Sequence, residues 1–188
     1  MIPVQSFCAK SYAGAPEQNM HFKYWKQGND IMIKLLQYIT AHKIDGSIAQ
    51  SAVWVLTNNH SLSDIYAGND IAAQKMVVYL AGLLHKPVPV FYGYHEHNTT
   101  PGLPAYNPKP LKMLAKFEYM AETDQVLTLG VFSEDGSTIE SVFENKVFGA
   151  GGHRFTVEFE AADVPAGKYY IRLLHEGQVL KEEVIKIE

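Results

Sequence analysis

The chain has 188 residues, of which 47% are hydrophobic and 19% charged, and its formal net charge at pH 7 is −4. These values are typical of a folded globular protein and exclude an intrinsically disordered chain. The basic residues form no run or stripe, so nucleic-acid binding is not expected. No apolar stretch is long enough for a transmembrane helix, and the start of the chain, MIPVQ, lacks the pattern of a signal peptide.

Residues 1–97 carry apolar residues at helical spacing. Helices are predicted over residues 30–39, 47–56 and 71–84. Their candidate N-caps are Asn29 or Asp30 for the first, Ser47 for the second and Asn69 for the third. This part of the chain is therefore predicted to be a small helical bundle.

The second half of the chain has a different period. Residues 98–110 contain four prolines and a glycine, which predicts a stiff, Pro-rich linker. In residues 111–188 apolar residues alternate with polar ones, and glycine-containing turns separate the alternating stretches. The inward-facing residues are predicted to be Leu127, Leu129, Val131, Phe155, Val157 and Phe159. The predicted class is α+β, with a helical bundle followed by an antiparallel β-sandwich.

The single cysteine, Cys8, lies in the sequence SFCAK at residues 6–10, and Gln50 lies in AQSAVW at residues 49–54. The second sequence resembles the Thr-Gln-x-Ala-(Ile/Val)-Trp signature of bacterial surface thioester domains. Phe7-Cys8 followed by Pro16 is similar to the aromatic-Cys element of that family. The resemblance implies that the Cys8 thiol and the Gln50 carboxamide condense to an internal thioester. It also implies a secreted or cell-surface protein that attaches covalently to a protein or polysaccharide ligand.

Two other roles for Cys8 are open. Free cysteine is among the most buried residue types, so Cys8 is also compatible with inert packing in a non-covalent structural or scaffold protein. A cysteine hydrolase built from Cys8, His60 and Asp64 is a third hypothesis, although the sequence around Cys8 matches no such enzyme. The chain is therefore not expected to be an enzyme.

The histidines offer further candidate chemistry. His60 follows the Gln50 helix, where it would assist by relaying protons or accepting an acyl group, or would cap the helix C-terminus. His95 and His97 alternate in an extended stretch, but no third and fourth ligand follow at suitable spacing. No metal site and no cofactor are expected.

The end of the chain resembles a second family. The sequences LGVFSEDG at residues 129–136, VPAGKYYIRL at residues 164–173 and EVIKI at residues 183–187 are similar to FlgD-type Ig-like modules, which also occur as secretion-sorting domains of Bacteroidetes surface proteins. This resemblance covers residues 112–188. It implies that the predicted sandwich is Ig-like and that the protein is extracellular or cell-surface.

Overall fold

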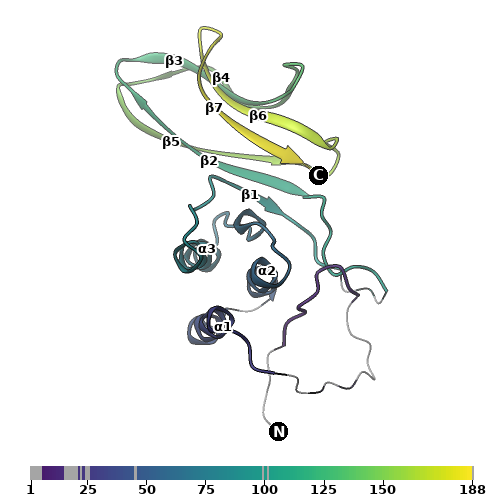
Figure 1. Ribbon diagram of the computed structural model, residues 1–188. Helices are drawn as coiled ribbons and strands as arrows, with labels where there is room; N and C mark the ends of the chain where they lie inside the picture. Colours follow the sequence, from purple (N-terminus) through teal and green to yellow (C-terminus); the bar gives the residue numbers. More distant parts are fainter. Residues whose placement is uncertain are drawn as a thin grey trace. The chain divides into compact units, whose positions relative to one another are not determined.

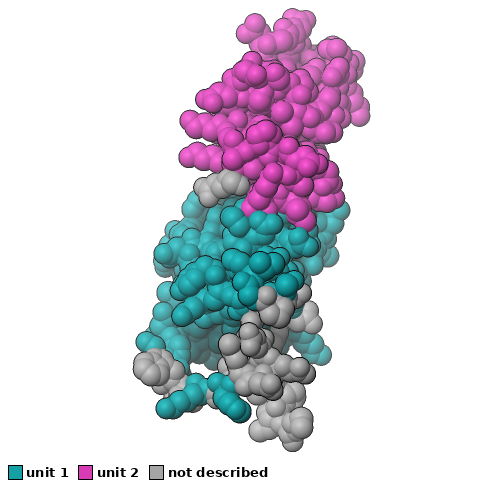
Figure 2. Space-filling view, turned by 90° about the vertical axis from the view of Figure 1, so that its right-hand side faces the viewer, with its two compact units in different colours: residues 1–108 teal, residues 109–188 magenta. Residues whose placement is uncertain are grey.

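We describe the protein from a computed structural model, in which residues 6–14, 21, 23, 26–44, 46–98, 100 and 102–187 are described. The chain divides into two compact units, residues 1–108 and residues 109–188, which are coloured separately in Figure 2. Buried apolar side chains occur in both units. Each unit therefore has the core that an independently folding domain needs.

Unit 1 is mainly helical in its described part (Figure 1). Its elements, in chain order, are α1 (Asp30–His42), α2 (Gly46–Thr57), the 3₁₀-helix η1 (Leu62–Asp64), α3 (Ile71–Leu84) and the short strand β1 (Phe91–Tyr94). The three predicted helices are thus present, each with ends within three residues of those expected.

Helix α1 has the predicted N-cap. The Asn29 side chain accepts a hydrogen bond of 2.9 Å from the backbone N–H of Met32, which satisfies one of the free donors at the helix start. The helix ends at Lys43, whose φ of 54° places it in the left-handed conformation that terminates many helices. Leu35 and Ile39 are buried and attach the helix to the core.

The other two predicted N-caps are wrong. Helix α3 is capped by Asp70, whose carboxylate accepts hydrogen bonds from the backbone N–H groups of Ala72 and Ala73 at 2.7 and 3.2 Å. Asn69 lies one residue too far from the helix to make these bonds. Helix α2 begins at Gly46, so Ser47 lies inside its first turn.

Helix α2 is the most deeply buried of the described helices. Its buried residues are Ala49, Ser51, Ala52, Val53, Trp54 and Val55. They do not form a single narrow face, because α2 contacts α1, η1 and α3. Trp54 is 1% exposed and belongs to the largest buried side chains of the unit. Functional side chains on α2 are therefore held on a rigid support.

The Pro-rich segment differs from the predicted linker over residues 98–110. The described residues up to 108 belong to unit 1. His97 and Tyr106 form an isolated antiparallel bridge. The backbone N–H of Ala105 donates to Ala13 O at 2.9 Å. The prolines prevent a regular strand, but the backbone N–H groups of Ala105 and Tyr106 still donate to carbonyl oxygens of the N-terminal segment.

Unit 2 consists of antiparallel strands (Figure 1). They are β2 (Lys112–Ala121), β3 (Gln125–Ser133), β4 (Thr138–Phe148), β5 (Gly151–Glu160), β6 (Gly167–His175) and β7 (Gln178–Ile187). Strand β2 pairs with β5, and the other strands form a sheet in the order β4-β3-β6-β7. The expected α+β class is confirmed at this level, with helices in the first half of the chain and antiparallel sheets in the second.

The residues of β3 and β5 that are predicted to face inward are buried, except that Phe155 is half-buried. Leu127, Leu129 and Val131 are fully buried, as the period of two predicts. The β6–β7 turn is formed by Glu176 and Gly177 with φ of 50° and 79°. Two successive positive φ values are the feature of the tight hairpin turn that matches the twist of antiparallel strands.

The helices in the described part of the chain include none that is both long enough and apolar enough to cross a lipid bilayer.

Candidate functional site

Cys8 and Gln50 lie together in unit 1, although 42 residues separate them in the sequence. The Cys8 backbone N–H donates to Gln50 Oε1 at 2.9 Å, and Gln50 Nε2 donates to the Cys8 carbonyl oxygen at 2.7 Å. The carboxamide of Gln50 therefore pairs with the cysteine backbone in the way that a neighbouring β-strand would. Helix α2 fixes Gln50, and Gln50 in turn fixes the segment that carries the thiol.

The thiol itself has a different partner. Cys8 Sγ donates to the carbonyl oxygen of Lys10 at 3.2 Å. Cys8 is half-buried, so the sulfur is neither enclosed in the core nor fully in solvent. In this conformation the carboxamide is hydrogen-bonded through both of its polar atoms, and the sulfur is bonded within its own segment.

His60 lies in a second cluster of polar side chains. Its Nε2 lies 3.0 Å from Ser11 Oγ, and its Nδ1 lies 3.4 Å from Asp64 Oδ2. The 3₁₀-helix η1 supplies Asp64, and Ser61 caps that helix by accepting a hydrogen bond from the Ser63 N–H. The predicted pairing of Cys8 with His60 and Asp64 is thus only partly met, since His60 and Asp64 are in contact but the third member is Ser11.

Ser11 is held on every side. Its backbone N–H donates to Asn58 Oδ1 at 3.1 Å, and its carbonyl oxygen accepts from the Tyr106 N–H at 3.0 Å. The residue is only 6% exposed. The N-terminal segment is therefore anchored at Cys8 by Gln50 and at Ser11 by Asn58, His60 and Tyr106.

Burial and neighbouring charges shift the histidines of this cluster. Burial lowers the pKa of His60 below its ordinary value of 6.5, Asp64 opposes this by favouring the imidazolium, and His95 adds to the lowering. Burial also lowers the pKa of His97, and His95 and His60 lower it further. Both imidazoles are therefore neutral at pH 7 and available as hydrogen-bond acceptors and bases.

Aromatic rings enclose the polar cluster. The Trp54 ring centroid lies 4.8 Å from that of His97 and 5.6 Å from those of His60 and Tyr106. Within the described part of the chain, the Trp54 Nε1–H is buried without a hydrogen-bond partner. A buried donor without an acceptor is costly, so this group is available to a water or a ligand oxygen.

His95 and His97 point to separate partners. His95 Nδ1 lies 3.0 Å from the carbonyl oxygen of Asn107, whereas His97 Nε2 lies 3.3 Å from Ser51 Oγ. Among the described residues, no group of three or more His, Cys, Asp or Glu side chains is arranged to hold a metal ion.

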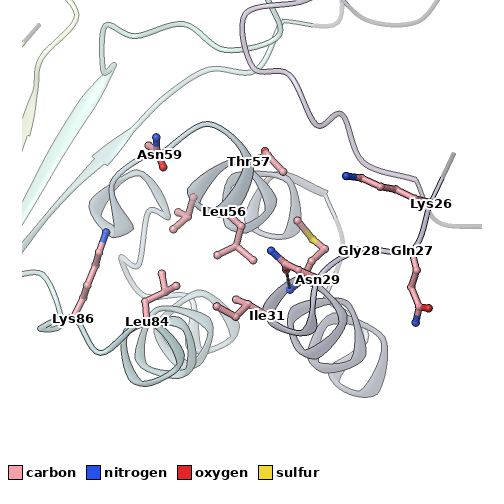
Figure 3. A pocket seen from close by; sticks show the side chains of 12 residues that line it. Lys26, Gln27, Gly28, Asn29, Ile31, Leu56, Thr57, Asn59, Leu84 and Lys86 are labelled. Atoms are coloured by element: carbon pink, nitrogen blue, oxygen red, sulfur yellow. Dashed lines mark hydrogen bonds between the residues drawn. The ribbon is translucent and has the colours of Figure 1, made fainter.

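An open pocket lies elsewhere in unit 1, among the ends of α1, α2 and α3 (Figure 3). Its volume is about 590 Å³, and Ile31, Leu56 and Leu84 form its apolar part. Lys26 and Lys86 lie on opposite sides of it in Figure 3. Neither Cys8 nor His60 lines this pocket.

Sequence patterns do not reveal the whole site. Cys8, Gln50, His60 and Asp64 stand out by residue type. Ser11 gives no such signal, because a serine in a loop is common and its contacts with residues 58, 60 and 106 depend on the tertiary fold. Pro16, part of the aromatic-Cys resemblance, lies outside the described residues.

Comparison with known proteins identifies no relative. No protein-family profile and no curated protein sequence matches the chain. One structural match is a crystal structure of a protein named as a beta-galactosidase, from Bacteroides fragilis. It is 15% identical, has a TM-score of 0.28, and aligns over 52% of this chain and 16% of that chain. A TM-score this low does not indicate a shared fold.

Proposed function

We propose that this protein is a secreted or cell-surface attachment protein that binds its ligand covalently through an internal thioester between Cys8 and Gln50. The observation that carries the proposal is the pair of hydrogen bonds between the Gln50 carboxamide and the Cys8 backbone. Thioester formation needs proximity more than any other factor, and these bonds hold the acyl carbon beside the cysteine. The reaction requires the Cys8 thiol to leave Lys10 O, its partner in this conformation, and to approach that carbon.

The bond-forming step conserves atoms without a co-reactant. The Cys8 thiolate attacks the Gln50 Cδ, the tetrahedral intermediate collapses, and the carboxamide nitrogen leaves as ammonia with the thiol proton. The product is a Cys8 Sγ–Gln50 Cδ thioester. An amine or hydroxyl of the ligand then attacks the same carbon, which leaves an amide or ester on the Gln50 side chain and returns the Cys8 thiol.

The ligand is a protein or polysaccharide that presents such a nucleophile. His60 enters this reaction only indirectly, since its Nε2 contacts Ser11 rather than Cys8. A proton relay from His60 to the thioester would therefore pass through Ser11, three residues further along the segment.

For unit 2 we propose an Ig-like, FlgD-type module that presents unit 1 at the cell surface. The support is the antiparallel pairing of all its described strands and the buried alternation on β3 and β6. The Tyr169 hydroxyl also donates to Pro165 O at 2.7 Å, which fixes the turn before β6 within the resembling VPAGKYYIRL sequence.

One observation favours a second function, that of a non-covalent scaffold with a packed cysteine. Both polar atoms of the Gln50 carboxamide are already hydrogen-bonded, and the thiol donates to Lys10 O. In this alternative Gln50 is a structural link between α2 and the N-terminal segment, and Cys8 never reacts.

Intact mass spectrometry of the full chain distinguishes the two functions. The thioester predicts a mass lower by one ammonia. Methylamine should add across the bond with its full mass, which leaves the chain one methylene group heavier than the unreacted sequence. The variants Cys8→Ala and Gln50→Ala should both abolish the deficit. Gln74→Ala is the matched control, because the Gln74 amide also bonds a backbone carbonyl but lies far from Cys8 in sequence. A wild-type chain of full mass that methylamine does not modify would exclude the thioester and favour the scaffold.

A further inference from the structure

Ser11, His60 and Asp64 form a continuous series of side-chain contacts in unit 1. Ser11 Oγ contacts Nε2 of His60, and Nδ1 of the same ring faces Asp64. We propose that Ser11 is a nucleophile for acyl transfer, with His60 as its general base and Asp64 as the residue that positions His60. The proposed substrates are small carboxylic esters. This activity goes beyond the proposed attachment and does not depend on it.

The order of atoms is the one that serine nucleophiles require. With the Nδ1–H directed to Asp64, Nε2 carries the lone pair and accepts the Ser11 hydroxyl proton at 3.0 Å. The 3.4 Å separation on the carboxylate side is loose, as such bonds often are before a substrate binds. Each of the three residues thus has the neighbour that its role needs.

Asp64 is itself fixed in place. The Tyr106 hydroxyl donates to Asp64 Oδ2 at 3.3 Å, and the Ser63 hydroxyl donates to Oδ1 at 3.4 Å. His95 Nε2 lies 3.9 Å from Asp64 Oδ1. The charged and titratable groups that face His60 are therefore Asp64, His95, His97 and Tyr106. Asp64 is the acidic member of this set.

The same unit contains a second serine–histidine contact that serves as an internal comparison. Ser51 Oγ lies 3.3 Å from His97 Nε2, and Ser51 is as buried as Ser11. Among the described residues, no carboxylate lies within ion-pair distance of His97, and no carboxylate contributes to its pKa. Ser51 therefore has a base without a positioning acid, and its hydroxyl is expected to be unreactive.

The proposed step balances with water as the second substrate. Ser11 Oγ attacks the ester carbonyl carbon while His60 Nε2 takes the hydroxyl proton. The tetrahedral intermediate expels the alcohol, which receives that proton from His60, and leaves an acyl group on Ser11. Water then attacks the acyl-serine with the same proton transfers, which releases the carboxylic acid and restores the hydroxyl. Since Ser11 is 6% exposed, only short acyl groups are expected to reach it.

The first experiment treats the full chain with diisopropyl fluorophosphate and locates the adduct by peptide mass spectrometry. The expected result is modification of Ser11, with fluoride as the leaving group. Ser11→Ala should abolish the adduct, and Ser51→Ala, the matched control, should leave it unchanged. Absence of an adduct, or an adduct elsewhere that persists in Ser11→Ala, would overturn the proposal. Thermal unfolding of both variants establishes that they are folded.

The second experiment measures the pH dependence of p-nitrophenyl acetate hydrolysis in a Cys8→Ala background, which removes any contribution of the thiol. Activity should rise as His60 loses its proton. Asp64→Asn should lower the acylation rate by about 10²- to 10⁴-fold. It should also move the midpoint to lower pH, because Asp64 raises the pKa of His60. An unchanged rate and midpoint in Asp64→Asn would contradict the assignment. Because the thioester is detected as a mass deficit, the two proposals fail independently.

Discussion

The two units of this protein differ in the kinds of side chain that they bury. Among the described residues, the side chains that unit 2 buries are apolar, and they alternate along β3 and β6. Unit 1 instead buries the polar side chains of Ser11, Ser51 and Ser63, and Ser11 contacts the half-buried His60. Buried polar groups are costly unless each is bonded, so their concentration in unit 1 makes that unit the candidate for a functional site.

The largest test of this contrast removes one large core side chain from each unit. Trp54→Ala should lower the free energy of unfolding of unit 1 by about 3–5 kcal/mol, because the cavity lies beneath His60, His97 and Tyr106. Phe117→Ala, also 1% exposed, should cost unit 2 a similar amount. Hydrogen exchange resolved by residue should show each loss confined to its own unit. Loss of protection in both units from either variant would contradict their independence.

A smaller effect is expected from Gln50→Ala. It removes two hydrogen bonds to Cys8 and should destabilise unit 1 by about 1–3 kcal/mol. Gln74→Ala removes one hydrogen bond, to Gly68 O, and should cost about 1 kcal/mol. Urea unfolding of both variants measures the difference. Equal costs would mean that the Gln50 carboxamide does not hold the N-terminal segment.

Mild acid should destabilise unit 1 more than unit 2. Because the pKa values of His60 and His97 are lower in the folded chain than their ordinary 6.5, the unfolded chain binds protons first as the pH falls. The stability of unit 1 should therefore be complete above pH 6.5 and decrease below it, toward the folded-state pKa values.

Unit 2 should respond only in stronger acid. Hydrogen bonds from Ser133 and Ser137 lower the pKa of Asp135 to about 2, so its contribution is present above its unfolded pKa and is lost as the pH approaches 2. Hydrogen exchange at pH 7, at pH 5 and near pH 2 checks both statements. Equal loss of protection in the two units at pH 5 would show that the histidines are not responsible.

The smallest predicted effect concerns the start of α3. Asp70→Ala removes the two hydrogen bonds of the N-cap and should cost about 1 kcal/mol. Asn69→Ala is the matched control and should change stability by less than about 0.5 kcal/mol. Thermal unfolding measures both. A larger loss of stability in Asn69→Ala than in Asp70→Ala would mean that Asn69 is the N-cap, as the sequence pattern predicted.

The helices, and the residues buried in β3, are predictable because they follow local rules. Leu35 and Ile39 recur at helical spacing, and Leu127, Leu129 and Val131 alternate. The cap of α3 is ambiguous by one residue, because Asn69 and Asp70 are both good caps and only the backbone angle decides between them. The pairing of the Pro-rich segment is not predictable in this way. Its partners, Ser11 and Ala13, lie more than ninety residues earlier, so the local sequence shows only the prolines and predicts a linker.

The candidate site is likewise only partly predictable from the sequence. The thioester resemblance rests on the Cys8 and Gln50 motifs, which are visible in the sequence, and the structure adds that these residues are in contact. Ser11 becomes a candidate only through its distance to His60. Residue type therefore predicts which side chains have reactive chemistry, whereas the fold decides which of them meet.

The bonds from Ser11 and Ala13 to Tyr106 and Ala105 also set an order of events during synthesis. The segment that carries the cysteine is fully tied down only after residue 106 has left the ribosome, and pairings so distant in sequence form late. Until then the thiol and the hydroxyl are ordinary solvated groups. The nascent chain thus emerges with Cys8 and Ser11 not yet in place, and the contacts of the candidate site form only when unit 1 folds.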